Sequence, residues 1–276
     1  MVRQVTRLPG AHFKRWALAA VLLGVTLACA VPVPTVEPLT KIEPVDEVQI
    51  IGLEGAERAE VRLRLVSDSI IVRPQAGLEL LRGRFSYNVD EWSPNVKQDT
   101  DAGLTRVTIG QGIGSQIPLG KSDEYFNAWE IELAPGIPLD LGVDIGSGQA
   151  ALDLTGLSVR NLGVTTGSAD VSLAFNAFNP EPLALLRLTT GTGKFIVSGL
   201  GNANFDRLSV LGGAGTVDLD FSGAMRRAAI VDVKAGAGKI NVRVPSTLGV
   251  RVTFTSTPAS SVDAVGFSEQ SDNVYI

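Results

Sequence analysis

Few residues of this 276-residue chain could do chemistry beyond charge pairing, because it has a single cysteine and a single histidine. The cysteine, Cys29, directly follows the uncharged apolar run Trp16–Ala28, and four basic residues and no acid precede that run. A basic segment followed by a short apolar run is typical of a signal peptide. The run would span only about 20 Å of a roughly 30 Å hydrocarbon core, so a permanent membrane helix is the weaker interpretation. We therefore expect export.

Two processing sites are compatible with the residues around Cys29. Thr26-Leu27-Ala28-Cys29 resembles the bacterial lipoprotein site, in which a small residue precedes the cysteine that receives the lipid, although leucine usually stands three residues before that cysteine. Ala28-Cys29-Ala30 also fits the A-x-A pattern, with cleavage before Val31. We favour lipid attachment at Cys29, because a lone cysteine at the end of the apolar run is otherwise hard to explain.

Loss of the signal segment changes both the charge and the chemistry of the chain. His12 and four basic residues leave with it, so the net charge changes from −5 to −9, with 20 basic against 29 acidic residues remaining. Binding to duplex nucleic acid needs a surplus of Lys and Arg and is disfavoured. Ser-His-Asp or Cys-His catalysis, histidine-ligated zinc and histidine-based pH sensing all need an imidazole or a thiolate. We expect none of these, and no internal disulfide.

Carboxylates remain as candidates for metal binding. Calcium needs six to eight oxygens that converge on one point, and neither the EF-hand loop nor the RTX nonapeptide spacing occurs. Solvation of an outer sheet face explains the strand aspartates equally well, so we expect no metal and no cofactor. The aspartates in question are Asp140, Asp144, Asp153, Asp170, Asp218, Asp220 and Asp232.

Carboxylate pairs could also hydrolyse glycosides, since that reaction uses only Asp and Glu. The candidate pairs, Asp90 with Glu91 and Asp123 with Glu124, are neighbours in loop-like segments, where charged turns are common. Nothing in their spacing singles out a catalytic pair. We assign no catalytic residue and expect that the chain is not an enzyme.

Aromatic and basic residues were considered as binding groups. For both tryptophans outside the signal segment we favour a place in the core of the first β region, and Trp129 belongs to the alternating run Trp129-Ile131-Leu133, which indicates a core face. Trp92, beside Pro94 in a predicted loop, is the better candidate of the two for a surface contact. Four late basic residues form a mild patch, which we interpret as part of a balanced surface: Arg226, Arg227, Lys234 and Lys239.

Strands must position these residues. From residue 138 onward the apolar residues alternate with period two, as in 139–145, 217–221 and 240–244, which predicts strands with one buried face. Before them, residues 29–47 contain four prolines, which favour extended backbone and oppose sheet pairing. We therefore predict a tether over 29–47.

Glycine-containing turns recur between the predicted strands. With Gly148, Gly167, Gly193, Gly215 and Gly238 as marks, the steps are 19, 26, 22 and 23 residues, and a period near twenty-two is typical of stacked units. No helical pattern follows the glycines, which excludes a phosphate-binding loop. A right-handed parallel solenoid and a chain of antiparallel hairpins both fit this period.

Five segments between residues 80 and 175 carry a resemblance to a known family: 80–87, 94–96, 129–133, 138–141 and, most specifically, 146–173. They resemble the toast-rack N-terminal domain family, a domain of unknown function related to the LiaF-like and putative-adhesin solenoids of bacteria. The resemblance implies an all-β, toast-rack-like solenoid outside the cytoplasmic membrane, with no assigned activity. LiaF-like relatives are linked to envelope stress signalling but carry transmembrane helices, and we expect none here beyond the signal.

We therefore predict five parts: a lipoprotein signal peptide at 1–28, a Pro-rich tether at 29–47, an N-terminal β region at 48–137, a glycine-punctuated right-handed β-helix at 138–256 and a tail at 257–276. The predicted function is non-enzymatic. It is that of an exported protein, lipid-anchored at the outer face of the cell membrane or else secreted, whose solenoid contacts an envelope protein or a glycan. The alternatives are an accessory regulator of envelope stress and a secreted, carboxylate-dependent polysaccharide-active enzyme.

Overall fold

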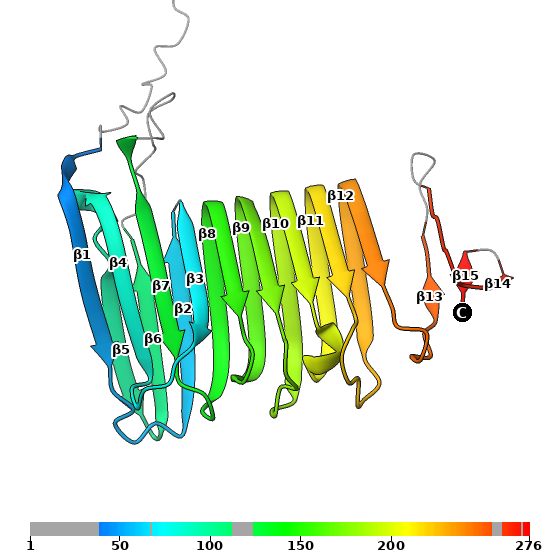
Figure 1. Cartoon of the computed structure of the whole chain (residues 1–276), viewed down its shortest axis with the longest axis horizontal. Coiled ribbons are helices and arrows are strands. Elements are labelled where there is room, and N and C mark those ends of the chain that lie inside the picture. Colours follow the sequence, from blue (N-terminus) through cyan, green and yellow to red (C-terminus); the bar gives the residue numbers. More distant parts are fainter. Residues whose placement is uncertain (1–38, 67, 112–123, 256–260, 272) are drawn as a thin grey trace, which may run out of the picture. The chain divides into compact units, whose positions relative to one another are not determined.

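The computed structural model describes residues 39–66, 68–111, 124–255, 261–271 and 273–276. The predicted signal peptide and Cys29 lie outside these residues. The described part is all-β, as predicted, and contains no α-helix (Figure 1). Its elements are β1 (Lys41–Ile51), β2 (Arg58–Leu65), β3 (Ser69–Pro74), β4 (Leu81–Val89), the 3-10 turn η1 (Asp90–Trp92), β5 (Asn95–Asp101), β6 (Leu104–Gly110), β7 (Asn127–Leu133), β8 (Pro138–Asp153), β9 (Ser158–Ala174), β10 (Leu183–Ser198), the 3-10 turn η3 (Leu200–Asn202), β11 (Phe205–Asp220), β12 (Ile230–Arg243), β13 (Val252–Thr253), β14 (Glu269–Ser271) and β15 (Val274–Tyr275).

The repeat region is a parallel solenoid. Strands β8 to β12 pair in sequence order, each parallel to the one before, so the antiparallel hairpin alternative is excluded for these strands. The true rung steps differ slightly from the predicted 19 and 26 residues. Gly146 stacks under Gly167 and Gly167 under Gly191, which gives steps of 21 and 24. The glycines chosen as marks in the sequence do not all occupy the same position of the corner: Gly167 is equivalent to Gly146 and Gly191, and not to Gly148 and Gly193.

Each long strand is bent into two arms that face each other. In β8 the buried residues are Leu139, Leu141, Val143 and Ile145 before the corner, and Ala150 and Leu152 after it. This change from odd to even positions turns the second arm back over the first, and in Figure 1 strands β8 to β12 fold over at their upper ends. The apolar side chains of both arms therefore share one core between two layers.

Glycine is required at the corners because successive rungs touch there. A Cβ on Gly167 would lie 2.6 Å from the carbonyl oxygen of Gly146, and one on Gly191 would lie 2.6 Å from that of Gly167. Gly148 and Gly193 also have φ of 108°, a conformation that side chains other than glycine rarely adopt. Close approach of the backbones and a positive φ therefore both require glycine at these corners.

The N-terminal strands extend both layers of the solenoid. In the first layer β5 pairs with β6, β6 with β2, and β2 with the first arm of β8. In the second layer the order is β1, β4, β7, β3 and then the second arm of β8. The pairs β1–β4, β4–β7 and β5–β6 are antiparallel, so this end of the sheet is mixed.

The predicted tether is wrong over its last seven residues. Strand β1 begins at Lys41 and pairs with β4 from Lys41 opposite Val89 to Ile51 opposite Leu81. Pro44 is tolerated because β1 is an edge strand with one paired side, and the pairing is irregular between Lys41 and Val45.

Asparagines organise the turns at the other end of the rungs. Asn179 is 1% exposed; its amide donates to the carbonyls of Val159, Glu181 and Ala203, and its Oδ1 accepts the backbone N–H of Val159. Asn204 repeats the pattern in the next rung, where its amide donates to the carbonyls of Asn179 and Glu181. These side chains replace the ladder hydrogen bonds that the turning backbone cannot make.

The last rung ends earlier than the predicted solenoid boundary at 256. Strand β12 stops at Arg243, and Pro245, which lacks an N–H, follows two residues later. Strand β13 lies within the predicted solenoid range but does not extend the solenoid. It pairs with β15, and β15 pairs with β14, in a separate three-stranded antiparallel sheet.

Candidate interaction surfaces

Trp92, the candidate for a surface contact, lies in the core instead. Its side chain is 0% exposed, because the turn η1 directs the indole into the core, where it meets Tyr125 edge-on with ring centroids 6.2 Å apart. Gln111 donates from its amide to the carbonyl of Trp92 at 2.9 Å and so fixes the turn. The loop position was correct, but a neighbouring proline does not determine which way a side chain points.

Trp129 lies in the core, as predicted. Its side chain is 2% exposed, its ring meets Phe85 edge-on at 5.1 Å, and its indole N–H donates to Asn127 Oδ1 at 3.1 Å. Both tryptophans outside the signal segment are therefore structural.

The strand aspartates do not converge. They lie on both layers, and each has its own partner. Side chains pair with four of them: Asn161 with Asp140, Arg64 with Asp144, Lys194 and Asn241 with Asp218, and Lys234 with Asp232. The other three accept a backbone N–H: Asp153 from Thr155, Asp170 from Lys194 and Asp220 from Ser222. Within the described ranges no three His, Cys, Asp or Glu side chains are grouped as metal ligands would be.

The surroundings of Glu91 suit a structural role and do not suit the role of a general acid. Its carboxylate accepts the backbone N–H of Thr40 at 3.1 Å, which holds the start of β1 against η1. Burial raises the pKa of Glu91, but hydrogen bonds from its own backbone and from Thr40 outweigh it, so the pKa lies below its usual value. A glycosidase acid needs a raised pKa. Of the second pair, Asp123 lies outside the described residues and Glu124 precedes β7.

The four late basic residues do not form one patch. Arg226 lies over the ring of Phe178, 3.9 Å from its centroid, and Arg227 pairs with Asp206 at 2.7 Å. Lys234 and Lys239 occupy opposite arms of β12. This separation agrees with the interpretation of a balanced surface.

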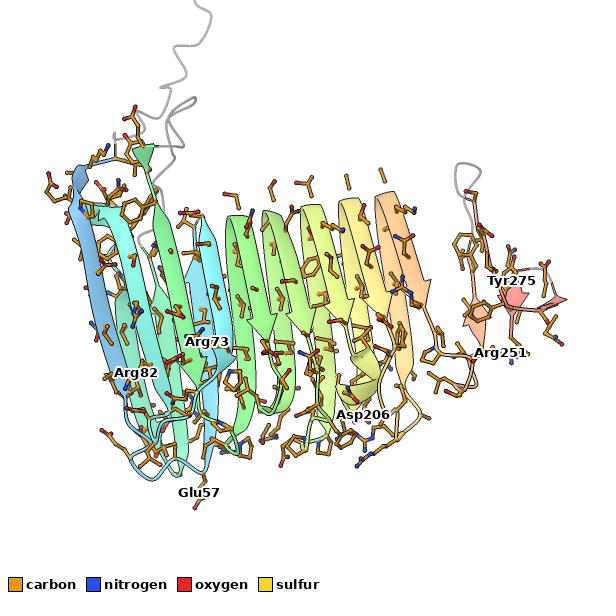
Figure 2. The ribbon with its side chains drawn as sticks, viewed as in Figure 1. Glu57, Arg73, Arg82, Asp206, Arg251 and Tyr275 are labelled. Carbon is orange, nitrogen blue, oxygen red and sulfur yellow. The ribbon has the colours of Figure 1, made fainter. Side chains whose placement is uncertain are left out.

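A surface of paired charges lies on the outer face of the second layer. Glu130 and Glu132 of β7 stand between Arg82 and Arg84 of β4 on one side and Arg73 of β3 on the other. Arg73 contacts both glutamates, at 2.5 and 2.9 Å, and its hydrogen bond to Glu132 raises the pKa of its guanidinium. Figure 2 labels Arg73 and Arg82 in this part of the sheet.

Exposed aliphatic side chains flank these charges. Val48 and Ile50 of β1, beside Arg84 and Arg82, are 52% and 54% exposed, and Ile71 of β3, beside Glu130, is 45% exposed. We call this surface the Arg/Glu face; it consists of Val48, Ile50, Ile71, Arg73, Arg82, Arg84, Glu130 and Glu132. Arginines beside aliphatic groups are common in protein interfaces, whereas isolated exposed aliphatics are common everywhere.

Of the three arginines on the Arg/Glu face, Arg84 makes the longest ion-pair contact. Its side chain is 63% exposed, and its contact with Glu130 is 3.7 Å long. Sequence reasoning missed this face. The alternating Arg82 and Arg84 in one strand and Glu130 and Glu132 in another were visible, but only the pairing of β4 with β7 makes them neighbours.

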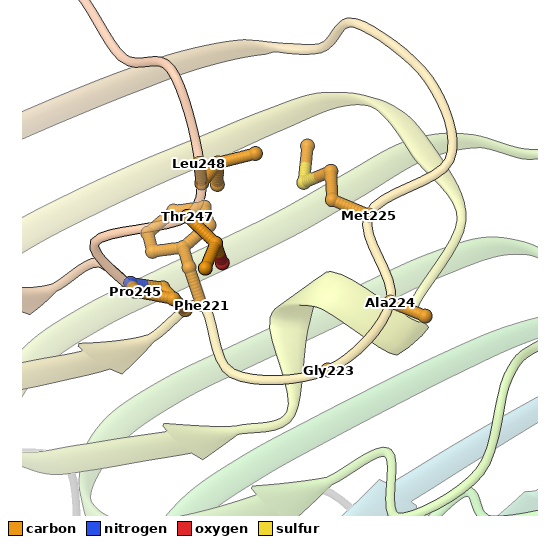
Figure 3. A pocket seen from close by; sticks show the side chains of 7 residues that line it. All are labelled: Phe221, Gly223, Ala224, Met225, Pro245, Thr247 and Leu248. Carbon is orange, nitrogen blue, oxygen red and sulfur yellow. The ribbon is translucent and has the colours of Figure 1, made fainter.

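A small pocket lies beside the last turns of the solenoid (Figure 3). Its volume is about 180 Å³, and it is lined by Phe221, Gly223, Ala224, Met225, Pro245, Thr247 and Leu248. This volume is below the roughly 300 Å³ at which small-molecule sites begin. The pocket also lacks a charged side chain that could orient a ligand.

Comparison with known proteins identifies the family and the fold. The family model for the N-terminal domain of toast_rack, DUF2154, matches residues 40–183, just over half of the chain. No curated protein matches the sequence.

Two solved structures that are similar to this chain come from bacteria. A "putative cell adhesion protein" from Clostridium sporogenes is 19% identical, with a TM-score of 0.54 over 73% of this chain and 99% of its own. A "putative adhesin" from Bacteroides fragilis is 9% identical, with a TM-score of 0.30 over 72% of this chain and 97% of its own. At this identity the first likeness shows a shared fold. Among the described residues, no helix is long and apolar enough to cross a bilayer.

Proposed function

We propose that this chain, which belongs to the toast-rack N-terminal domain family, is an exported, lipid-anchored envelope protein that binds a partner protein with its solenoid and catalyses no reaction. The Arg/Glu face carries this proposal. It combines exposed aliphatic side chains with arginines on one sheet face, and such a surface suits a protein partner better than a small molecule.

The family and the fold support a binding role. The family is a domain of unknown function, and the similar structure from Clostridium sporogenes is named for cell adhesion. Binding needs an accessible surface and no catalytic groups. The two layers supply broad faces, and many of the side chains that point outward from them are short. Along one ladder of the second layer these residues are Ile71, Ala151, Ser172, Ile196, Asp218 and Asn241.

The anchoring part of the proposal rests on the N-terminal sequence. With Cys29 as the lipidated first residue, residues 30–40 separate the anchor from β1. At about 3.1 Å per residue, such a Pro-containing spacer reaches roughly 30 Å from the membrane. A diacylglyceryl group has two chains, enough for stable retention where one chain is marginal.

The intact mass of the protein from its own cells, together with membrane fractionation, tests the anchor. A diacylglyceryl group on an N-terminal Cys29 in the membrane fraction is the expected result. A soluble chain beginning at Val31 would remove the anchor and leave a secreted binding protein.

Capture from envelope extracts tests the binding face. Arg84→Glu places a negative charge beside Glu130 and is expected to weaken partner capture at least about tenfold, the size of effect typical of a residue central to an interface. Arg187→Glu, an exposed charge reversal on the outer face of the first layer, is the matched control. Equal loss in both variants would mean that the Arg/Glu face is not the binding surface. Capture by purified glycan instead of protein would replace the partner class.

A further inference from the structure

The last rung exposes the core of the solenoid. Strand β12 pairs with β11 on one side, and within the described part its other edge has no partner strand. Its inward side chains Val231, Ile240 and Val242 are 40%, 37% and 49% exposed. Their counterparts one rung earlier, Leu208, Val217 and Leu219, are no more than 3% exposed. An apolar, unpaired edge of this kind is usually covered or blunted, and a terminal repeat normally carries a polar cap.

The opposite end of the sheet is blunted. Strand β1 carries Pro44, which has no N–H to donate, and its inward positions opposite Phe85 and Gly83 are Glu47 and Gln49. The edge strand of the first layer, β5, is polar and mostly exposed. These features oppose the addition of another strand. Of the two described ends, only the β12 end is therefore suited to extension of the core.

We propose that β12 is a dimerisation edge, at which two copies of this chain pair β12 with β12 in antiparallel orientation across a two-fold axis. The axis runs along the rung, through the corner between the arms. Rotation about it exchanges the two layers, so the first arm of each copy meets the second arm of the other, and the strands run in opposite directions. The rotation leaves the position of each residue along the rung unchanged. Val231, in the first arm of one copy, therefore lies opposite Val242, in the second arm of the other.

This register is complementary for both faces of the strand. On the inner face Val233 meets Ile240 of the second copy, so the apolar stripe continues across the interface. On the outer face Asp232 stands opposite Asn241 of the second copy and diagonal to its Lys239 and Arg243, which carry the opposite charge. The one unfavourable pair, Lys234 opposite Lys239 of the second copy, lies beside the corner, where the Lys234 side chain is 73% exposed and can point into solvent.

The asymmetry of the two ends determines the size of the assembly. A two-fold contact uses the same edge of both copies and leaves none of it free. Because β1 and β5 resist pairing, the outer ends of the dimer remain closed. A dimer is expected, and a filament is not.

Sedimentation equilibrium of the full chain in its exported form tests the proposal, in detergent if the chain is lipidated. The expected result is a dimer that dissociates on dilution. Ile240→Lys puts a charge at the paired edge, on a residue that is already partly exposed in the monomer, and is expected to raise the dissociation constant at least about a hundredfold. Gln49→Lys, at an exposed inward position of the edge strand at the other end, is the matched control and should leave the dimer intact.

Cross-linking tests the register independently of stability. Mixed Val233→Cys and Ile240→Cys chains are expected to form a disulfide-linked dimer, identified by peptide mapping, since opposite residues of antiparallel strands lie about 5 Å apart at their Cα atoms. Neither variant alone should do so, because its two cysteines would lie in layers about 10 Å apart. A monomer at all concentrations, loss of the dimer in Gln49→Lys, or equal cross-linking in single variants would overturn the proposal. A monomer whose β12 amides are protected would show that residues 244–276 cover the edge instead.

Discussion

At the scale of single residues, the chain uses polar side chains to complete its backbone rather than to do chemistry. Asn179, Asn204 and Glu91 each bind backbone groups that no strand can reach. Their roles follow from the turning of the chain, and two predictions follow from them.

Asn179→Ala removes four hydrogen bonds from a buried site. The N–H of Val159 and three carbonyls lose their partner, and we expect a loss of about 3–5 kcal/mol in the free energy of unfolding, the range of the largest single-site effects. Urea unfolding followed by circular dichroism measures it. Asn161→Ala is the control, because Asn161 bonds only the half-exposed Asp140 side chain, and it should cost less than about 1 kcal/mol. Equal losses would contradict the role assigned to Asn179.

Glu91 should make stability depend on acid pH. Its folded pKa lies below its usual value, so its contribution is fully present above the unfolded pKa of about 4.3 and is lost as the pH falls through the folded pKa. Glu91→Gln should therefore lower the unfolding temperature at pH 7, and the difference from the parent should vanish in stronger acid. A pH series of melting curves checks this, with Asp90→Asn as the control for an adjacent charge change. A constant difference down to pH 2 would contradict the prediction.

At the scale of elements, the rungs depend on corners that allow no side chain. Gly191→Ala would place a methyl group 2.6 Å from the Gly167 carbonyl, and we expect a cost of about 1–3 kcal/mol as the rungs separate. Gly163→Ala lies within an arm, with nothing within 4 Å of the added Cβ, and should be neutral or slightly stabilising. Chemical denaturation measures the free energy of unfolding of the two variants. Similar values would contradict the claim that the corners require glycine.

The alternation and the glycines predicted these elements well, because a period of two fixes which side chains face the core and glycine marks where backbones touch. Other features could not be predicted. Pro44 opposes pairing by local rules, yet β1 has an unpaired side on which a missing N–H costs nothing. Trp92 was the candidate for a surface contact because its neighbours suggest a loop, but its burial depends on the fold of distant residues such as Tyr125. The Arg/Glu face arises from pairing between strands that are distant in the sequence, such as β4 and β7, and the sequence does not reveal this pairing.

At the scale of the whole molecule, each rung from β8 to β12 pairs, within the described residues, only with the strands adjacent to it in the sheet. Stability in such a stack is a sum of rung and interface contributions, so protection should be greatest for interior rungs. We expect hydrogen exchange to be slowest in β9 and β10, and exchange in β12 to slow as protein concentration rises. Mass-spectrometric exchange at two concentrations measures both. Uniform protection along the solenoid would contradict the first expectation.

The register of the glycine corners also determines which changes in chain length the fold can absorb. Removing one residue from an arm turns every later side chain of that arm to the wrong face. Removing the 24 residues 162–185 instead joins Asn161 to Leu186, which occupies the position of Leu162 one rung further on, and every inward and outward position is kept. Viable insertions and deletions should therefore come as whole rungs or fall in the turns, so that this architecture changes its reach in steps without redesign of its core.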